Sequence, residues 1–152
     1  YTNNALVTRE AIDSIDDAFP LEFNETGCED TYFFSKLAQN GYPTTLCKEA
    51  RVFEFVPHSR ISRRWVWRRA FRIGSGQTIV QKKLFGKRKT ALRLIGYMFL
   101  NTIRGTKEIV FGFLYGQNGR VVHGIRLYAT MIGMIAGFFN ITYKEYHAVH
   151  GE

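Results

Sequence analysis

The charged residues of this chain are distributed so unevenly that its two parts must form different kinds of structure. Residues 1–58 carry four Lys or Arg against ten Asp or Glu, whereas residues 59–152 carry 17 against three, within a net charge of +8. The basic part is also rich in aromatic and aliphatic residues, a combination typical of segments that contact an anionic membrane surface. We therefore predict an acidic unit over residues 1–58 and a basic, mostly helical, membrane-proximal unit over residues 59–152.

The acidic unit shows the mixture of helix and strand signals that is expected of an α/β fold. Two helices are predicted, a short one that begins after Thr8 and a longer one over residues 29–40 that ends at an Asn-Gly stop signal. Strands are predicted over residues 44–47 and 50–56, and in the second segment Val or Glu alternates with Phe. The expected fold class is therefore α/β.

The basic unit is predicted to consist of amphipathic helices. Ser62 is a suitable N-cap for a helix that reaches Phe85, after which a short basic cluster interrupts the pattern. Three apolar runs follow, over residues 91–103, 109–115 and 127–143, and the last has 17 residues without a charge. Because that length is at the lower limit for crossing a bilayer, helices that lie in the membrane interface fit better than spanning helices. The alternative is a soluble helical subdomain whose apolar faces form its core.

Glu29 and Asp30 are the candidate catalytic residues. They follow Gly27 closely and stand at the start of the predicted 29–40 helix, where the positive end of the helix dipole favours ionised carboxylates. A carboxylate fixed at such an edge suits a general base that takes the proton of a hydroxyl nucleophile. The alternative is that both acids only cap the helix, as Asp and Glu commonly do.

Arginines recur at every fourth residue after the second predicted strand. They are Arg60, Arg64, Arg68 and Arg72. Guanidinium groups at this spacing share one face of a helix and suit the oxygens of a diphosphate or of lipid phosphates. We assign Arg60 and Arg64 to a diphosphate and the later arginines to the membrane, with a merely solvated basic face as the alternative. Trp65 could stack on a sugar or anchor at a membrane interface.

Four segments occur in an order that resembles a known enzyme family. They are Asn3-Asn4-Ala5-Leu6-Val7-Thr8-Arg9, the loop with Phe19, Gly27-Cys28-Glu29-Asp30 and Val56-Pro57-His58-Ser59-Arg60. Together they resemble the C-terminal half of the catalytic domain of inverting family-2 glycosyltransferases, which have the Rossmann-like GT-A fold. The resemblance implies transfer of a sugar from a nucleotide-sugar donor to a glycan or lipid-linked acceptor. It is closest to bacterial enzymes of exopolysaccharide or cell-surface glycan synthesis.

The resemblance also implies roles for individual residues. In that family the aspartate of the Glu-Asp pair is the general base, so this role falls on Asp30, and Glu29 orients the base or the acceptor. Asn3 and Asn4 would lie in the loop beneath the acceptor, with ordinary turn formation as the alternative. Trp65 is a further candidate for contact with the acceptor.

A divalent metal, Mg²⁺ or Mn²⁺, is implied by the same resemblance, bound mainly by an Asp-x-Asp motif. This chain contains no such motif. In the family the motif and the nucleotide-binding strands belong to the first half of the fold, so we expect this sequence alone to be inactive. His58 follows a predicted strand and Pro57, where many of these enzymes have a histidine that contacts the metal or the diphosphate. The alternative is a histidine at the surface.

Two other classes of function compete with the transferase. One is a non-catalytic membrane-surface adaptor in which the acidic pair only caps a helix. The other is a nucleic-acid-binding module, but the chain lacks helix-turn-helix, zinc or RNA-recognition signatures, and we expect no nucleic-acid partner. The expected partners are a nucleotide sugar, a glycan or lipid-linked acceptor and an anionic membrane surface. The expected location is the cytoplasmic face of a bacterial inner membrane.

Overall fold

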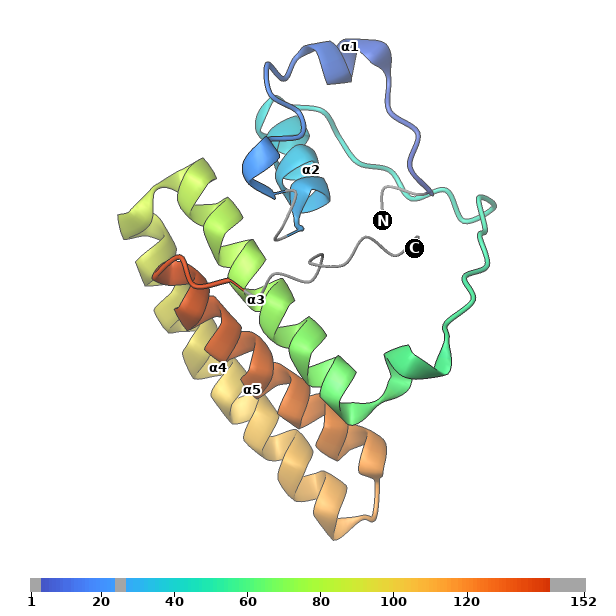
Figure 1. Ribbon diagram of the computed structural model, residues 1–152, viewed down its shortest axis with the longest axis vertical. Helices are drawn as coiled ribbons and strands as arrows, with labels where there is room; N and C mark the ends of the chain where they lie inside the picture. The colour runs from blue at the N-terminus through green and yellow to red at the C-terminus, as the bar shows by residue number, and fades with distance from the viewer. Residues whose placement is uncertain (1–3, 24–26, 143–152) are drawn as a thin grey trace, which may run out of the picture.

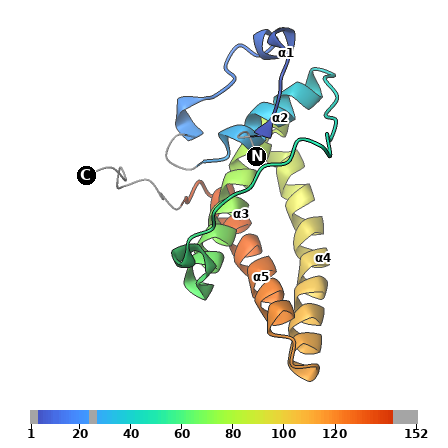
Figure 2. The same ribbon diagram turned by 90° about the vertical axis from the view of Figure 1, so that its right-hand side faces the viewer.

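The computed structural model describes residues 4–23 and 27–142, and every regular element in these ranges is helical (Figure 1). The elements are α1 (Arg9–Asp13), the 3-10 helix η2 (Leu21–Phe23), α2 (Glu29–Gln39), the 3-10 helix η3 (His58–Ile61), α3 (Arg63–Phe85), α4 (Lys87–Leu114) and α5 (Asn118–Phe138). In the bundle of the last three, α5 packs against both α3 and α4, which have little contact with each other. Figures 1 and 2 show α3 and α5 running in the same direction and α4 in the opposite one.

The predicted α/β fold class is wrong, because the part of the chain that the structure describes contains no β-strand. Residues 44–47 and 50–56 are irregular, and Phe53 and Phe55 in the second segment are 99% and 87% exposed. A strand is stable only when a neighbouring strand takes up its backbone hydrogen bonds. The alternation of apolar residues has no such partner here, so these residues do not form part of a Rossmann-like sheet.

Several predicted helix boundaries are confirmed. At the start of α1, Thr8 Oγ1 accepts a hydrogen bond from the Ala11 N–H (3.3 Å), and at the start of α3, Ser62 Oγ accepts one from the Trp65 N–H (3.2 Å). The predicted 29–40 helix is α2, and α3 ends directly before a glycine, as expected. These boundaries were predictable because capping side chains satisfy backbone groups that the first turn leaves unpaired.

The two apolar runs over residues 91–103 and 109–115 belong to one continuous helix, α4. Gly105, which stands between the two runs, lies in the contact between α4 and α5. A Cβ at Gly105 would approach the Tyr128 ring to 2.9 Å, and one at Gly124 of α5 would lie 2.7 Å from the Gly105 carbonyl oxygen. The glycine therefore permits a close approach of two helices. The last apolar run, over residues 127–143, belongs in large part to α5, which begins at Asn118 and ends at Phe138.

The contact between α3 and α5 joins the two backbones directly. A Cβ at Gly133 would lie 2.0 Å from the Phe71 carbonyl oxygen, and one at Gly137 would meet the α3 backbone at 2.3 Å. From the α3 side, a Cβ at Gly74 would lie 2.1 Å from the Thr130 carbonyl oxygen. Distances this short leave no room for a side chain, so the helices touch through small residues, as helices in membranes often do.

The acidic part of the chain packs on α3 through a small apolar cluster. Phe23 from η2, Tyr32 from α2 and Val80 from α3 are buried against one another. Lys83 of α3 extends over the rings of Phe23 and Tyr32, at 5.6 and 5.0 Å from their centroids, and pairs with Glu22. Burial of each large apolar side chain contributes roughly 1.5–3 kcal/mol. The cluster therefore holds the first turn of α2 against the C-terminal third of α3.

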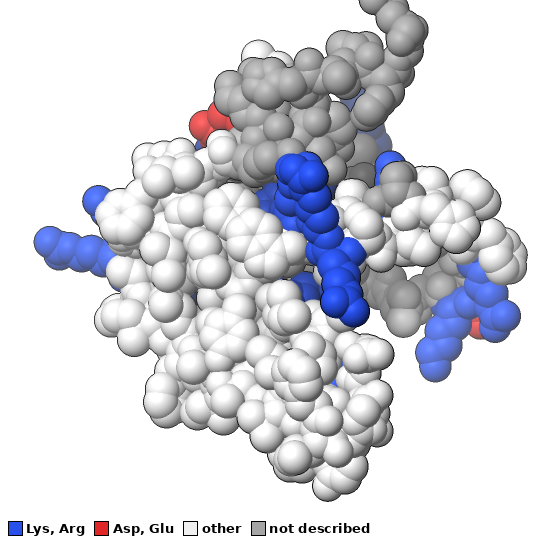
Figure 3. Space-filling view, turned by 60° about the horizontal axis from the view of Figure 1, so that its bottom comes forward, with Lys and Arg blue, Asp and Glu red and all other residues white. Residues whose placement is uncertain are grey.

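Many large apolar side chains of the bundle remain exposed, especially along α4. Figure 3 views the end of the molecule that lies at the bottom of Figure 1, where α4 turns into α5. It shows a broad surface of uncharged residues with Lys and Arg at its margins. The apolar faces of these helices are therefore not all used to form a core.

Replacing Gly133 by alanine is expected to destabilise the bundle by roughly 1–3 kcal/mol, because the methyl group would overlap the Phe71 carbonyl oxygen and force α3 and α5 apart. Gly96→Ala is the matched control, since no heavy atom lies within 4 Å of its Cβ position in the same bundle. That control is expected to stabilise the protein by about 0.5–1 kcal/mol. Urea unfolding followed by far-UV circular dichroism measures both changes. Equal free energies of unfolding for the two variants would contradict the close α3–α5 contact.

Candidate functional site

The predicted carboxylate pair lies at the N-terminus of α2. Gly27 and Cys28 have left-handed backbone angles, with φ of +71° and +74°, and turn the chain sharply into the helix. Glu29 and Asp30 follow in the first helical turn, both half-buried, where the helix dipole favours negative charge. The predicted position at a helix N-terminus is confirmed, whereas the catalytic roles stay predictions.

One oxygen of Asp30 is held by the residue that follows it. Thr31 donates to Asp30 Oδ1 both from its backbone N–H (2.7 Å) and from its hydroxyl (3.3 Å). Two donors on one oxygen orient the carboxylate. This arrangement leaves Oδ2 as the oxygen of Asp30 that can contact a bound group.

Glu29 lies beside Arg72 of α3. Glu29 Oε2 is buried and accepts no hydrogen bond within the described part of the chain. The position of a Cβ on Gly27 would be 2.8 Å from Arg72 Nη1 and 3.9 Å from Glu29 Oε2, so guanidinium and carboxylate share one small space. Glycine is required at position 27 because its φ is positive and because any side chain there would meet the Arg72 guanidinium. Arg72, which we assigned to the membrane from the sequence, faces the start of α2 instead.

Cys28 is a packing residue at the same position. A Cβ at Gly76 of α3 would lie 2.3 Å from Cys28 Sγ, so the thiol occupies the space that this glycine leaves open. Burial raises the pKa of the Cys28 thiol to about 11, although the positive charge of Arg72 acts in the opposite direction. The thiol is therefore protonated at neutral pH and does not act as a nucleophile.

A polar pocket of about 260 Å³ lies beside the carboxylate pair, between α2, α3, α4 and α5. Its polar residues form three pairs, each one helical turn apart: Thr31 and Ser35, Gln77 and Gln81, and Arg93 and Tyr97. Its apolar wall is formed by Val80, Leu84, Phe85 and Met134. Hydroxyl, amide and guanidinium groups beside an apolar wall can bind the hydroxyls and the ring face of a sugar. Thr31 connects the polar pocket to Asp30, because it lines the pocket and its hydroxyl bonds the carboxylate.

The polar pocket was not predicted from the sequence. The spacing of four residues within each pair was the available signal, since it places both members on one face of a helix. Which of these faces meet depends on how α2, α3 and α4 are arranged around α5, and no local pattern specifies that arrangement.

Two of the predicted binding residues contact the irregular segment that precedes α3. Asn4 Nδ2 donates a hydrogen bond to the Ala50 carbonyl oxygen (2.8 Å). Arg60 pairs with Glu54 at 3.6 Å, an exposed contact worth at most about 1 kcal/mol. Asn3 lies outside the described residues.

The other predicted residues lie at or before the start of α3, whereas α2 packs farther along this helix (Figures 1 and 2). Arg64 precedes Arg72 by eight residues, or about 12 Å along the helix axis. Trp65 is covered by Arg69, whose Cζ lies 5.1 Å from the centroid of the indole ring. The structure therefore does not bring His58, Arg64 or Trp65 together with the carboxylate pair.

No metal site is formed by the described residues, because they contain no group of three His, Cys, Asp or Glu side chains that could hold an ion. His58 is exposed at the start of η3. The residues present in this part of the chain therefore do not fit a divalent cation, and the metal role of His58 stays a prediction from the family resemblance.

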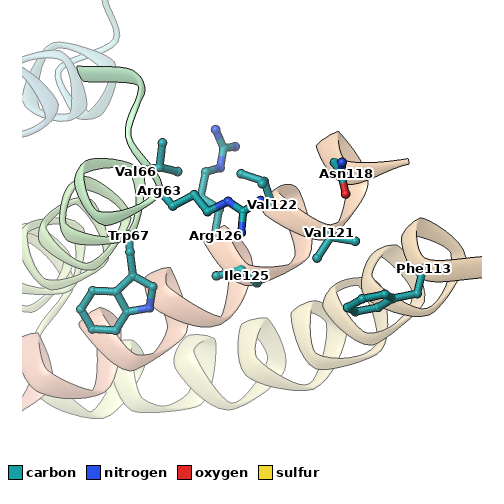
Figure 4. Close-up of a pocket in the computed structure, with 9 residues that line it drawn as sticks. All are labelled: Arg63, Val66, Trp67, Phe113, Asn118, Val121, Val122, Ile125 and Arg126. Atoms are coloured by element: carbon teal, nitrogen blue, oxygen red, sulfur yellow. The ribbon is translucent and has the colours of Figure 1, made fainter. Parts of the chain in front are cut away.

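A second pocket, of about 160 Å³, lies where α4 turns into α5 and faces the start of α3 (Figure 4). It is lined by Arg63, Val66, Trp67, Phe113, Asn118, Val121, Val122, Ile125 and Arg126. We call it the basic pocket, because two guanidinium groups from different helices border an apolar floor. Arg63 lines the basic pocket, whereas Arg64, which we predicted to bind a diphosphate, does not. Arg63 and Arg72 are about 180° apart around α3, so the basic pocket and the carboxylate pair lie on opposite sides of that helix.

Comparisons with known proteins give one curated relative. No protein-family model and no solved structure matches the chain. Over 92 residues, the chain is 38% identical to the "Succinoglycan biosynthesis protein ExoM" of Rhizobium meliloti (strain 1021). The match covers 59% of this chain but 29% of that protein, so the chain spans less than a third of its relative. The similarity agrees with the predicted area of exopolysaccharide synthesis, and it does not confirm the assignment to family-2 glycosyltransferases.

The free energy of unfolding is expected to fall between pH 9 and pH 11 because of Cys28. Burial raises the pKa of this thiol from 9.0 to about 11 in the folded protein, so the unfolded chain loses the proton first. Stability that is fully present below pH 9 is then lost as the pH approaches 11. Urea unfolding of the wild type and of Cys28→Ala across this range isolates the thiol, since lysines and tyrosines titrate in both proteins. Parallel pH curves for the two proteins would argue against a buried neutral thiol.

Proposed function

We propose that this chain is part of a protein that transfers a sugar in exopolysaccharide synthesis, with Asp30 as the general base. The observation that carries the proposal is the setting of Asp30 at the N-terminus of α2. Its carboxylate is oriented by Thr31, and Thr31 also lines the polar pocket. The 38% identity to a succinoglycan biosynthesis protein supports the same area of function.

The polar pocket suits the acceptor sugar. Gln77 and Gln81 each offer two N–H donors and a carbonyl acceptor, which match neighbouring hydroxyls on a sugar ring. The guanidinium of Arg93 is fixed over the Phe85 ring, with Cζ 4.1 Å from the ring centroid, and its N–H groups can donate to sugar oxygens. A volume of about 260 Å³ suits a single sugar unit, since sites for larger ligands begin near about 300 Å³.

In the proposed transfer, a hydroxyl of the bound acceptor gives its proton to Asp30 as the hydroxyl oxygen attacks the anomeric carbon of a nucleotide sugar. The bond from that carbon to the diphosphate breaks on the opposite side, so the configuration inverts. The nucleoside diphosphate leaves with the bonding electrons. Glu29, whose Oε2 is buried beside Arg72, is assigned a positioning role that fixes the first turn of α2 on α3. Donor binding is not assigned to the described residues, because the chain spans 29% of the length of its relative.

The second candidate is a non-catalytic membrane-surface adaptor, and the exposed apolar residues of α4 favour it. In that case Asp30 stabilises the helix N-terminus and has no chemical role. Substitution of Asp30 separates the two candidates.

Asp30→Asn removes the base but keeps the shape of the side chain. Sugar transfer by membranes of cells that express the natural gene is expected to fall by roughly 10²-fold or more. Asp13→Asn is the control, since Asp13 is an exposed acid of α1 that pairs with Arg9 at 2.9 Å. Immunoblotting ensures that equal amounts of the variants are compared. Transfer by Asp30→Asn at a near-wild-type rate would remove the catalytic role and leave the adaptor.

Gln77→Leu and Gln81→Leu are expected to raise KM for the acceptor more than they lower kcat, because each removes hydrogen bonds to the bound sugar. A neutral hydrogen bond contributes about 0.5–1.5 kcal/mol, so each substitution is expected to weaken binding by roughly 2–10-fold. Gln39→Leu, at the exposed end of α2, is the matched control. Steady-state kinetics at varied acceptor concentration measures the effect, and an unchanged KM in both pocket variants would exclude this pocket as the acceptor site.

A further inference from the structure

The burial pattern of α4 is the reverse of the pattern in helices of water-soluble proteins. Its buried residues are small or polar, namely Thr90, Asn101, Gly105 and Gly112. Six of its large apolar residues are between 46% and 72% exposed, and we call them the outer stripe: Leu92, Ile95, Phe99, Ile103, Val110 and Leu114. A helix at the surface of a soluble protein turns its apolar face to the core and its polar face to solvent. The outer stripe therefore needs a partner that is absent from the bundle.

The outer stripe forms one continuous face. At 3.6 residues per turn, its six members lie within about 60° of one direction, and the buried residues of α4 lie on the opposite side, against α5. From Leu92 to Leu114 the stripe extends over about 33 Å. Figure 2 shows α4 at the edge of the bundle, with α5 as its neighbour. A continuous apolar face of this length marks an interaction surface, whereas single exposed apolar residues do not.

Close packing of small residues explains how α4 is held without burying its large side chains. A Cβ at Gly112 would lie 2.6 Å from Val121 Cγ2 and 2.8 Å from the Val121 backbone nitrogen. Helices in membranes associate in this way, because burial of apolar side chains gains nothing when the solvent is lipid. α5 is the one helix of the described part of the chain that is long and apolar enough to cross a membrane, a test that core helices of soluble proteins also pass.

The charges around the outer stripe are almost all positive. Residues 87–138, which form α4, α5 and the turn between them, contain eight Lys or Arg and a single acid, Glu108. Glu108 is paired with Arg120 at 2.9 Å, so its charge is compensated. At the end of the bundle where α4 turns into α5, Figure 3 shows a broad uncharged area with Lys and Arg at its margins, and such a surface is complementary to an anionic bilayer.

We propose that the outer stripe of α4 lies in the interface of an anionic phospholipid bilayer, with α4 parallel to the membrane surface. Arg104 and Lys107 lie along one edge of the stripe, about 60–120° around the helix from its centre. In this orientation their long side chains reach the lipid phosphates while the stripe enters the acyl region. A spanning α4 would instead carry Arg104 and Lys107 into the hydrocarbon, which is strongly unfavourable.

The basic pocket provides a site for a lipid phosphate at the end of the outer stripe. Phe113, which is next to Leu114 of the stripe, lines this pocket together with Arg63 and Arg126 (Figure 4). Among the described residues, neither of these arginines has an acidic partner within ion-pair distance. Two uncompensated guanidinium groups above an apolar floor match the phosphate and the first part of an acyl chain of one phospholipid.

Co-sedimentation of the whole 152-residue chain with lipid vesicles tests the outer stripe. The wild type is expected to bind vesicles of phosphatidylglycerol and phosphatidylcholine, and the double variant Phe99→Glu/Ile103→Glu to bind about ten-fold more weakly or worse, because two charges enter the apolar face. Leu21→Glu/Leu46→Glu is the matched control, since both leucines are 82% exposed and lie outside the bundle. Circular dichroism and the urea midpoint verify that each variant is folded.

Depth measurements test the orientation. After Cys47→Ser, Leu92→Cys, Phe99→Cys and Leu114→Cys each offer one exposed thiol for a fluorophore, since Cys28 is protonated and packed against α3. Quenchers placed at known depths in the acyl chains are expected to give the same shallow depth at all three positions. A depth that increases steadily from one end of α4 to the other would overturn the parallel orientation.

The double variant Arg63→Gln/Arg126→Gln tests the phosphate site. Its preference for phosphatidylglycerol over phosphatidylcholine vesicles is expected to fall several-fold. Arg9→Gln/Arg51→Gln, with the same change of net charge outside the bundle, is expected to keep the wild-type preference. Equal preferences in the two double variants would overturn the assignment of the basic pocket to a lipid phosphate.

The remaining outcomes separate this proposal from the catalytic one. Absence of wild-type binding to anionic vesicles, or binding that Phe99→Glu/Ile103→Glu leaves unchanged, would overturn the membrane contact. Self-association that the same substitutions abolish, without vesicle binding, would assign the outer stripe to a second copy of the chain. Asp30→Asn is expected to bind vesicles like the wild type, so loss of the catalytic proposal would leave this one intact.

Discussion

Backbone contact between α3 and α5 is the constraint on which the rest of the structure depends. Because Gly74 and Gly133 allow the helices to meet at their carbonyl groups, the bundle needs few large side chains in its interior. Large apolar residues are thereby left for its outside, where they form the outer stripe. The same contact fixes α3 as the support on which Cys28 and Tyr32 of the α2 region pack. The outer stripe and the polar pocket beside the carboxylate pair thus both depend on the contact between α3 and α5.

Features that depend on one helical turn were predictable from the sequence, and features that depend on distant partners were not. Thr8 and Ser62 cap their helices through bonds to residues three positions away, so local reading sufficed. The prediction of strands over residues 44–47 and 50–56 was wrong because a strand must pair with a second segment, and alternation within one segment does not show whether such a partner exists. The role of Gly105 could not be read from the sequence either, because it depends on Gly124 and Tyr128 of a different helix.

The candidate site likewise has one part that was predictable from the sequence and another that was not. The location of Asp30 followed from a local helix start, whereas the polar pocket combines pairs from three helices that meet only in the folded bundle. The arginines spaced by four do not stay on one face of α3. A spacing of four residues advances the side chain by about 40° beyond each full turn, so successive arginines rotate around α3. Arg72, the last of them, reaches the carboxylate pair, whereas Arg63, which is outside this series, faces the basic pocket on the other side.

The shared direction of α3 and α5 has an electrostatic consequence at the basic pocket. Both helices begin there, α3 at Arg63 and α5 at Asn118. Each start contributes a field equivalent to roughly half a positive elementary charge, whereas α4, which ends at Leu114 beside the pocket, contributes the opposite partial charge. Two helix starts against one helix end leave a positive backbone field, to which the guanidinium groups of Arg63 and Arg126 add. Because backbone amides do not titrate, this part of the field persists at every pH at which the helices remain folded.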